Sequence, residues 1–334
     1  MAPKAPLVSV VLPVKNGGQF LDSAVDSILQ QSLEDFELLL VDDHSSDDSI
    51  SRLDKNDSRL KILPSQGQGI VSALNTGLAA AKGHFIARMD ADDYSLPHRF
   101  RTQLDFLAEQ PSIHIVGAQV EMFAENTLAG GYRRYQCWIN SLRSPEDIRR
   151  ELFIESPLPH PSWFMHRKVI DQLGHYRDMP WPEDYDFLLR ADAAGMFMAK
   201  PDSVLLRWRD HEQRLSRCDD RYAVHQFQAA KASFLASHRI GGRRVAIWGA
   251  GPTGRVMHDL LDQLGVAISG FIEVHPRRVG GSKRGLPVFD YRTGLPDKNH
   301  LLLIAVGVAK ARNEIREHLQ ERGWCEGENY LFVA

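Results

Sequence analysis

The chain of 334 residues is 43% hydrophobic and 25% charged, which suits two globular domains with buried cores. Its 40 Lys and Arg side chains nearly balance its 43 Asp and Glu side chains, so the overall charge gives no attraction to nucleic acid, and we expect no nucleic-acid partner. The three cysteines fit neither a disulfide framework nor a Cys-x-x-Cys metal site. No apolar run reaches the roughly 20 residues of a transmembrane segment, so we expect a cytoplasmic protein with at most peripheral membrane contact.

Two strand-loop-helix units are predicted near the N-terminus. Residues 7–12 are apolar and β-branched and predict a strand, and apolar residues at helical spacing across 20–29 predict the helix that follows. The apolar run 36–41 predicts a second strand, which stops at Asp42 and Asp43. The polar residues after it are typical of a turn that also caps a helix.

A third unit ends in another acidic cluster. Apolar residues at helical spacing across 70–81 predict a helix, and the run 85–89 predicts a strand that leads into the acidic segment 90–93. Strands that alternate with helices indicate an α/β fold with a mostly parallel sheet, in which ligands bind beyond the carboxyl ends of the strands. Three loops are therefore expected to converge on one crevice.

Beyond residue 116, the sequence pattern changes twice. Between 117 and 201, short apolar runs, prolines and aromatic residues indicate a wall of irregular loops. The pattern across 219–238 predicts one long helix, and the glycines and charges of 239–244 predict a linker. The first domain is accordingly expected at 1–238 and the second at 245–334.

The C-terminal segment begins with a predicted strand at 245–248 and continues as a small α/β module. Gly249, Gly251 and Gly254 form a glycine-rich turn before the next predicted helix, and Glu273 ends the following strand. That order satisfies much of the dinucleotide-binding fingerprint. A proline inside the turn removes an amide donor, however, and no substrate domain follows, so a binding or interface role is favoured over redox catalysis.

The acidic segment after the third strand carries the strongest chemical signal. Asp90 and Asp92 would project beyond the strand end, and carboxylates are ligands that Mg²⁺ and Mn²⁺ prefer, usually together with phosphate oxygens. In isolation, such a triplet is more often a solvated turn that caps the next helix. The neighbouring motifs therefore decide between a metal site and a cap.

Four ordered motifs favour the metal site: 8–16 (VSVVLPVKN), 41–47 (VDDHSSD), 87–93 (ARMDADD) and 181–187 (WPEDYDF). Together they resemble family 2 glycosyltransferases of the GT-A fold (nucleotide-diphospho-sugar transferases) over residues 7–215. The resemblance implies a nucleotide-sugar donor, an inverting transfer to an acceptor hydroxyl, and a role in glycan or cell-surface polysaccharide synthesis. The wall of loops would then face the acceptor, a glycan or a lipid-linked molecule.

The resemblance also assigns the donor side. Pro13, Asp42 and Asp43 match positions that hold the nucleotide base and ribose, and an acidic acceptor suits the imide N–H of uracil, so a UDP-sugar is favoured. Asp43 is the stronger candidate of the two acids. Lys15 stands where many members carry an aromatic residue, and its stem could cover the base instead. Asp90 matches the position near the ribose and the metal.

The remaining assignments concern the metal and the base. Asp92 matches the direct ligand of Mn²⁺ or Mg²⁺, and His211, in an Arg-x-His segment, can complete that site. Asp93 is expected to act as a support or a helix cap. Asp184 matches the catalytic base that takes the acceptor proton. By position alone, it could instead be a first-turn residue that complements the helix dipole.

Two other functions stay open on the sequence. An NAD-dependent oxidoreductase would work through the C-terminal module, which resembles Rossmann-like modules appended to sugar-modifying enzymes. A non-catalytic binding scaffold would keep the fold without transferring a sugar. The intact carboxylates at all the matching positions argue against such a scaffold.

Overall fold

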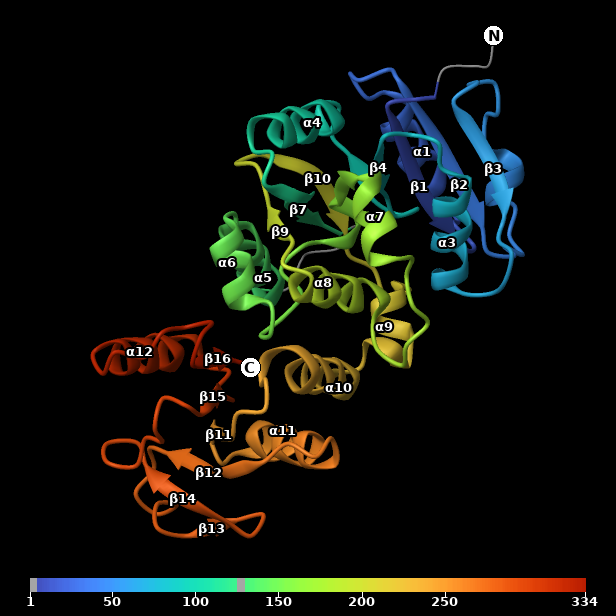
Figure 1. The fold of residues 1–334 in the computed structure, drawn as a ribbon. Coiled ribbons are helices and arrows are strands. Elements are labelled where there is room, and N and C mark those ends of the chain that lie inside the picture. The colour runs from blue at the N-terminus through green and yellow to red at the C-terminus, as the bar shows by residue number, and fades with distance from the viewer. Residues whose placement is uncertain (1–4, 125–129) are drawn as a thin grey trace. The chain divides into compact units, whose positions relative to one another are not determined.

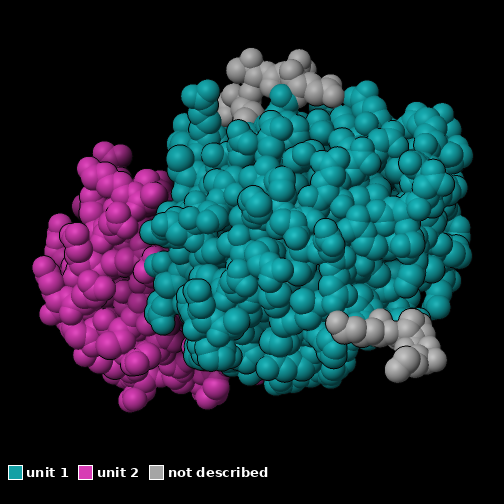
Figure 2. Space-filling model, turned by 90° about the horizontal axis from the view of Figure 1, so that it is seen from above, with its two compact units in different colours: residues 1–148, 157–179, 186–219 teal, residues 149–156, 180–185, 220–334 magenta. Residues whose placement is uncertain are grey.

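The computed structural model describes residues 5–124 and 130–334 (Figure 1). The chain divides into two compact units, coloured teal and magenta in Figure 2. Unit 1 contains the described residues up to 148 together with 157–179 and 186–219, and unit 2 contains 149–156, 180–185 and 220–334. Two short segments that lie before residue 186 thus group with the C-terminal part, and the linker at 239–244 stays a prediction.

The main sheet of unit 1 has the strand order β3-β2-β1-β4-β8-β6-β9. Its strands are β1 (Val8–Val14), β2 (Phe36–Asp42), β3 (Leu60–Pro64), β4 (Phe85–Arg88), β6 (Ile113–Val116), β8 (Phe164–His166) and β9 (Phe197–Ala199). The strands β1 to β4 are parallel, whereas β8 runs antiparallel to both β4 and β6. The predicted α/β fold with a mostly parallel, mixed sheet is confirmed.

The central strand β1 is buried along its whole length because helices cover both faces of the sheet there. On one face, Leu12 packs in the same core as helix α1 (Leu21–Leu29). Val11 points to the other face, toward helix α3 (Ile70–Ala80). There Gly77 comes so close that a Cβ atom on it would lie 2.5 Å from Val11 Cγ1.

A second sheet of unit 1 has the order β5-β10-β7, with β5 (Tyr94–Ser95), β10 (Val204–Arg209) and β7 (Gln119–Phe123). Helix α5 (Gly130–Ser141) covers the free edge of β7. Gln136 Oε1 accepts a hydrogen bond from Met122 N at 2.6 Å. Asn140 accepts one from Val120 N at 2.9 Å and donates one to Val120 O at 2.8 Å. Side chains of the helix thus take the place of a neighbouring strand.

The region 117–201 is more regular than the sequence predicts, and the interpretation as a wall of irregular loops was wrong. Besides strands, it contains α5, α6 (Pro145–Glu151), η1 (His160–Ser162), α7 (Arg167–Leu173) and α8 (Glu183–Ala193). These elements are short and separated by prolines and glycines, so no long periodic pattern marks them. The other helices of unit 1 are α2 (Ser49–Arg52), α4 (Arg99–Glu109) and α9 (Leu215–Cys218).

Unit 2 has a six-stranded sheet with the order β13-β14-β12-β11-β15-β16. Its elements are η2 (Asp220–Tyr222), α10 (Val224–Phe234), the π-helical η3 (Leu235–Arg239), β11 (Val245–Trp248), α11 (Pro252–Gln263), β12 (Ile268–Glu273), β13 (Ser282–Lys283), β14 (Leu286–Asp290), β15 (Leu301–Ile304), α12 (Ala309–Gln320) and β16 (Tyr330–Phe332). All neighbouring strands except β13 and β14 are parallel. The long helix predicted at 219–238 is interrupted, because η2 ends at Tyr222 and α10 begins only at Val224.

Among the described residues, no helix has the length and apolar character that crossing a membrane requires.

Replacing Gly77 by alanine tests the packing of α3 on β1. Alanine favours a helix by up to about 1 kcal/mol, but overpacking typically costs about 1–3 kcal/mol. We therefore expect G77A to lower the free energy of unfolding, measured in urea. The matched control is G131A in α5, where a Cβ atom meets nothing within 4 Å and stability should not fall. An unchanged or raised stability of G77A would contradict this packing.

Candidate active site

Three loops meet at the carboxyl edge of the main sheet, as expected from the sequence. They follow β1, β2 and β4 and lie side by side because β1 pairs with both other strands. The first two loops are joined: Asn16 Oδ1 accepts a hydrogen bond from Ser46 N at 2.7 Å, and Asn16 N donates to Ser45 Oγ at 2.9 Å. Asn16 and His44 have φ angles of 54° and 57°, which are uncommon for residues other than glycine and cluster at functional sites.

Asp43 is the more enclosed of the two acids at the end of β2. Its carboxylate is buried, both oxygens accept a hydrogen bond from Gly69 N at 3.0 Å, and Oδ2 lies 3.6 Å from Lys15 Nζ. Asp42 Oδ1 instead accepts a backbone hydrogen bond at 2.9 Å that closes its own turn. Pro13 is buried within β1. Of the predicted donor-side residues, Asp43 and Lys15 therefore face each other.

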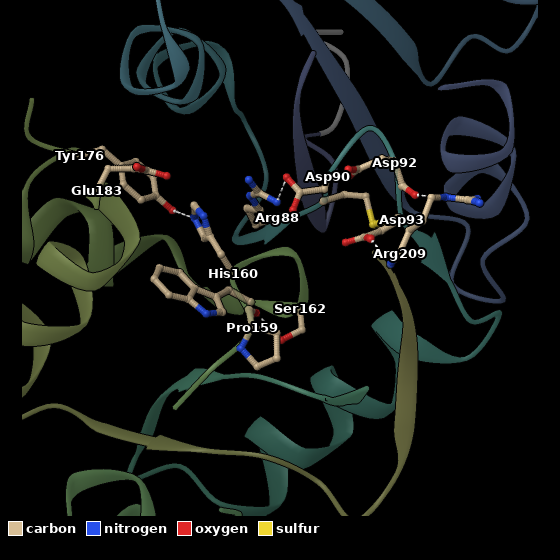
Figure 3. Close-up of polar contacts among 12 residues, drawn as sticks. Arg88, Asp90, Asp92, Asp93, Pro159, His160, Ser162, Tyr176, Glu183 and Arg209 are labelled. Atoms are coloured by element: carbon tan, nitrogen blue, oxygen red, sulfur yellow. Dashed lines mark hydrogen bonds and ion pairs between the residues drawn. The ribbon is translucent and has the colours of Figure 1, made fainter. Parts of the chain in front are cut away.

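The acidic loop after β4 contains three neighbouring carboxyl groups. Asp90, Asp92 and Asp93 each place one oxygen within 4.8 Å of the others. Arg88 forms an ion pair with Asp90 (Figure 3). On the other side, His211 Nε2 lies 2.7 Å from Asp92 Oδ2. The structure thus brings together the three predicted metal-site residues and adds Asp93 to them.

Asp93 is the least compensated of the three acids. Its Oδ1 accepts a hydrogen bond from Arg209 N at 2.8 Å, whereas its Oδ2 is buried and has no hydrogen-bond partner among the described residues. Burial raises the pKa of Asp93 well above its usual value, and the charges of Asp92 and Asp90 raise it further. A hard divalent cation prefers such oxygen ligands and would satisfy the orphaned atom. The residues present therefore fit a metal ion.

The other two carboxyl groups differ in how readily they ionise. Burial raises the pKa of Asp90, and the charge of Arg88 offsets this only in part. Burial also opposes ionisation of Asp92, but the hydrogen bond from His211 and the charge of Arg214 outweigh it, so the pKa of Asp92 is lowered. Asp92 is therefore the acid of the cluster that ionises most readily.

A buried histidine and tyrosine occupy the segment before α8. His160 Nε2 and Tyr176 OH lie 2.8 Å apart (Figure 3). The Trp163 ring centroid is 4.4 Å from that of His160. Burial holds the pKa of His160 well below its usual value, and the charge of Arg88 lowers it further. The imidazole is therefore neutral near pH 7.

Two arginines hold the acidic loop, a role that neither the motif 87–93 nor the Arg-x-His segment predicted for them. The side chain of Arg88 is 6% exposed and pairs with Asp90. Arg209 Nε donates to Asp92 O at 2.7 Å (Figure 3). A charged residue on a buried strand is rare without a partner, so the Arg-x-Asp order was a signal for Arg88. The contact of Arg209 joins residues 117 positions apart, and no local pattern could show it.

Asp184 lies in the first turn of α8, where it is half-buried. Its Oδ1 accepts a hydrogen bond from Tyr185 N at 2.7 Å. The neighbouring acids have structural partners: buried Glu183 accepts hydrogen bonds from Tyr222 OH at 2.9 and 3.1 Å, and buried Asp186 pairs with two arginines. Asp184 is thus the most exposed of these three acids, and its role as a base stays a prediction.

In the glycine-rich turn of unit 2, close packing explains why glycine stands at two of the three positions. Gly249 has a φ angle of 108°, and a Cβ atom on it would lie 3.0 Å from Ala305 O. A Cβ atom on Gly254 would lie 1.9 Å from Gly249 O, whereas one on Gly251 would meet nothing within 4 Å. Glu273 is buried and accepts a hydrogen bond from an arginine at 3.1 Å. Of these three glycines, only Gly251 has free space beside its Cα atom that a ligand could occupy.

Comparisons with known proteins agree with this arrangement. Residues 9–174 match the model of glycosyl transferase family 2. An uncharacterized glycosyltransferase of Haemophilus influenzae is 29% identical over 63% of this chain and 68% of its own length. The O-antigen biosynthesis glycosyltransferase WbnJ of Escherichia coli is 28% identical over 68% of this chain and 83% of its own length.

A likeness to solved structures supports the fold. The structure of S. aureus TarS 1-349 in complex with UDP-GlcNAc superposes with a TM-score of 0.56 at 15% identity, over 77% of this chain and 70% of that one. The present chain spans 40% of a longer TarS structure. The mixed sheet with acidic loops at its carboxyl edge is the expected GT-A fold. Through residues 9–174, the chain belongs to glycosyl transferase family 2 and is a glycosyltransferase.

Proposed function

We propose that this enzyme transfers a sugar from a nucleotide-diphosphate sugar to a hydroxyl group of a glycan or lipid-linked acceptor, with inversion at the anomeric carbon. The observation that carries the proposal is the meeting of three carboxyl-edge loops, which places buried Asp43 and the cluster of Asp90, Asp92 and Asp93 on neighbouring strands. A role in cell-surface polysaccharide synthesis is supported by the similarity to WbnJ, an O-antigen biosynthesis glycosyltransferase. A cytoplasmic location, with peripheral membrane contact allowed, belongs to the same proposal.

The donor-side residues have separate tasks in this proposal. Asp43 accepts a hydrogen bond from the uracil imide or from a ribose hydroxyl, and Lys15 covers the base with its stem while its ammonium reaches toward a phosphate. UDP is favoured, and the UDP-GlcNAc in the TarS complex supports that choice. Asp42 and Pro13 shape the loop beside the base, and Asp90 lies near the ribose.

The metal would be Mn²⁺ or Mg²⁺, held by Asp92 with help from Asp90, Asp93 and His211. The imidazole favours Mn²⁺ over Mg²⁺. When bound, the cation neutralises the departing diphosphate. Asp184 takes the proton from the acceptor hydroxyl as its oxygen attacks the anomeric carbon.

For unit 2, we propose a Rossmann-like module with a binding or interface role. In chain order, its parallel strands β11, β12, β14, β15 and β16 have the spatial order 3-2-1-4-5, which is typical of doubly wound folds. Gly249 and Gly254 are needed for packing, and Glu273 already pairs with an arginine, so these residues support nucleotide binding only weakly. An NAD-dependent oxidoreductase is therefore the less favoured alternative.

Ligand-dependent thermal stability tests the donor site. Mn²⁺ with UDP should raise the unfolding temperature of the wild type, because a ligand at about 100 times its Kd adds about 2.7 kcal/mol. D92A should lose this response, and other nucleoside diphosphates should act more weakly. If NAD(H) alone stabilised the protein and no nucleoside diphosphate did, the active site would lie in unit 2.

Replacing Asp184 by asparagine tests the base. Without a proton acceptor, the rate of sugar transfer should fall roughly 10²- to 10⁴-fold, while Mn²⁺ with UDP still binds. D171N, which changes an exposed acid in α7, serves as the control and should keep its activity. Ordinary transfer by D184N would remove Asp184 from this role.

The pH dependence of Mn²⁺ binding tests the acidic cluster. The raised pKa of Asp93 means that this group still holds a proton at a pH where an ordinary aspartate is ionised. The cation requires the ionised form, so the Kd for Mn²⁺ should increase as the pH falls through that raised pKa. Calorimetry should show proton release on binding. D93N should bind more weakly but with a flatter pH profile, and a wild-type profile in D93N would exclude Asp93.

A further inference from the structure

We propose that Arg209 is a positioning residue for the acidic loop, fixed in place by the aromatic rings of Phe20 and Phe123. The inference rests on the proposed function, because it concerns the same metal and donor site. Arg209 does not need to contact the metal or the substrate for this role. It determines where the carboxylates of Asp92 and Asp93 stand.

The guanidinium of Arg209 contacts two aromatic rings. Its central carbon is 4.4 Å from the ring centroid of Phe20 and 4.5 Å from that of Phe123. At these distances, a cation is attracted to the ring face, and the planar guanidinium also packs against it. The two rings therefore leave the side chain little freedom to rotate.

From this fixed position, Arg209 holds the acidic loop twice. Its side-chain Nε donates a hydrogen bond to Asp92 O at 2.7 Å, and its backbone N donates one to Asp93 Oδ1 at 2.8 Å (Figure 3). One bond fixes the backbone of the loop and the other fixes a carboxylate. A shift of Arg209 would therefore move two of the three acids together.

The same stack extends to the histidine of the site. The ring centroid of Phe20 lies 5.1 Å from that of His211, whose Nε2 contacts Asp92. Phe20 comes from the loop between β1 and α1, which also carries Lys15. Arg209 ends β10, and Phe123 ends β7. The stack therefore aligns the donor loop, the acidic loop and the histidine with one another.

Arg207 offers a matched control on the same strand. Its guanidinium carbon also lies 4.5 Å from the ring centroid of Phe123. Its Nε, however, donates to Glu121 Oε2 at 3.0 Å in an exposed ion pair. Arg207 thus shares the cation and the ring contact of Arg209, but its described partners do not include the acidic loop.

The test is the Kd for Mn²⁺ alone, measured on the full chain by electron paramagnetic resonance of the free ion. Lysine keeps the charge but lacks the planar fork, so R209K should weaken binding about tenfold or more, as loss of a ligand-orienting group typically does. R207K should stay within about twofold of the wild type. F20L should also raise the Kd for Mn²⁺, whereas F20Y, which keeps an aromatic ring, should have a Kd close to that of the wild type.

Unfolding temperatures measured without metal show whether each variant folds, and if R209K does not, the pair of F20L and F20Y carries the test. A folded R209K, or a folded F20L, with the Kd of the wild type would overturn the inference and leave the proposed function intact. If wild type and D92A bound Mn²⁺ equally, the proposed metal site would be wrong, and this inference would be wrong as well. In the sugar-transfer assay, R209K should raise KM for the donor more than KM for the acceptor.

Discussion

Mutual repulsion among three carboxyl groups within 4.8 Å is the constraint around which unit 1 is arranged. In a partly buried loop, like charges at such distances oppose ionisation strongly. The compensating groups come from different parts of the chain: Arg88 from the adjacent strand, and Arg209 and His211 from the end of β10. The second sheet has a structural purpose in this light, because β10 ends at Arg209, which donates two hydrogen bonds to the acidic loop.

The sequence was sufficient where local pattern and position on the sheet coincide. Strand ends at Asp42 and Asp90 could be located from hydrophobic runs, and parallel pairing then brings such ends to one edge. The stack of Arg209 with Phe20 could not be found in this way, because its members are far apart in the sequence and none is unusual in its own surroundings. The same limit explains Asp93, whose orphaned oxygen results from burial that only the folded chain creates.

The domain division shows a second limit of sequence patterns. Glycines and charges at 239–244 mark a break in periodicity, yet contacts group 149–156 and 180–185 with the C-terminal strands. Buried contacts there, such as Tyr185 OH to Leu152 O at 2.7 Å, join segments whose patterns are unremarkable. Composition shows where a periodic pattern breaks, but it does not show which distant segments pack together.

The cover of α5 over β7 has a consequence for the behaviour of the protein at high concentration. An uncovered edge strand offers its amides and carbonyls to any extended chain, and it can thereby start intermolecular sheet growth. Gln136 and Asn140 already occupy the amides and one carbonyl of β7 that a newcomer would need. Two side-chain amides thus leave this edge of the second sheet with fewer free backbone groups to pair with another chain.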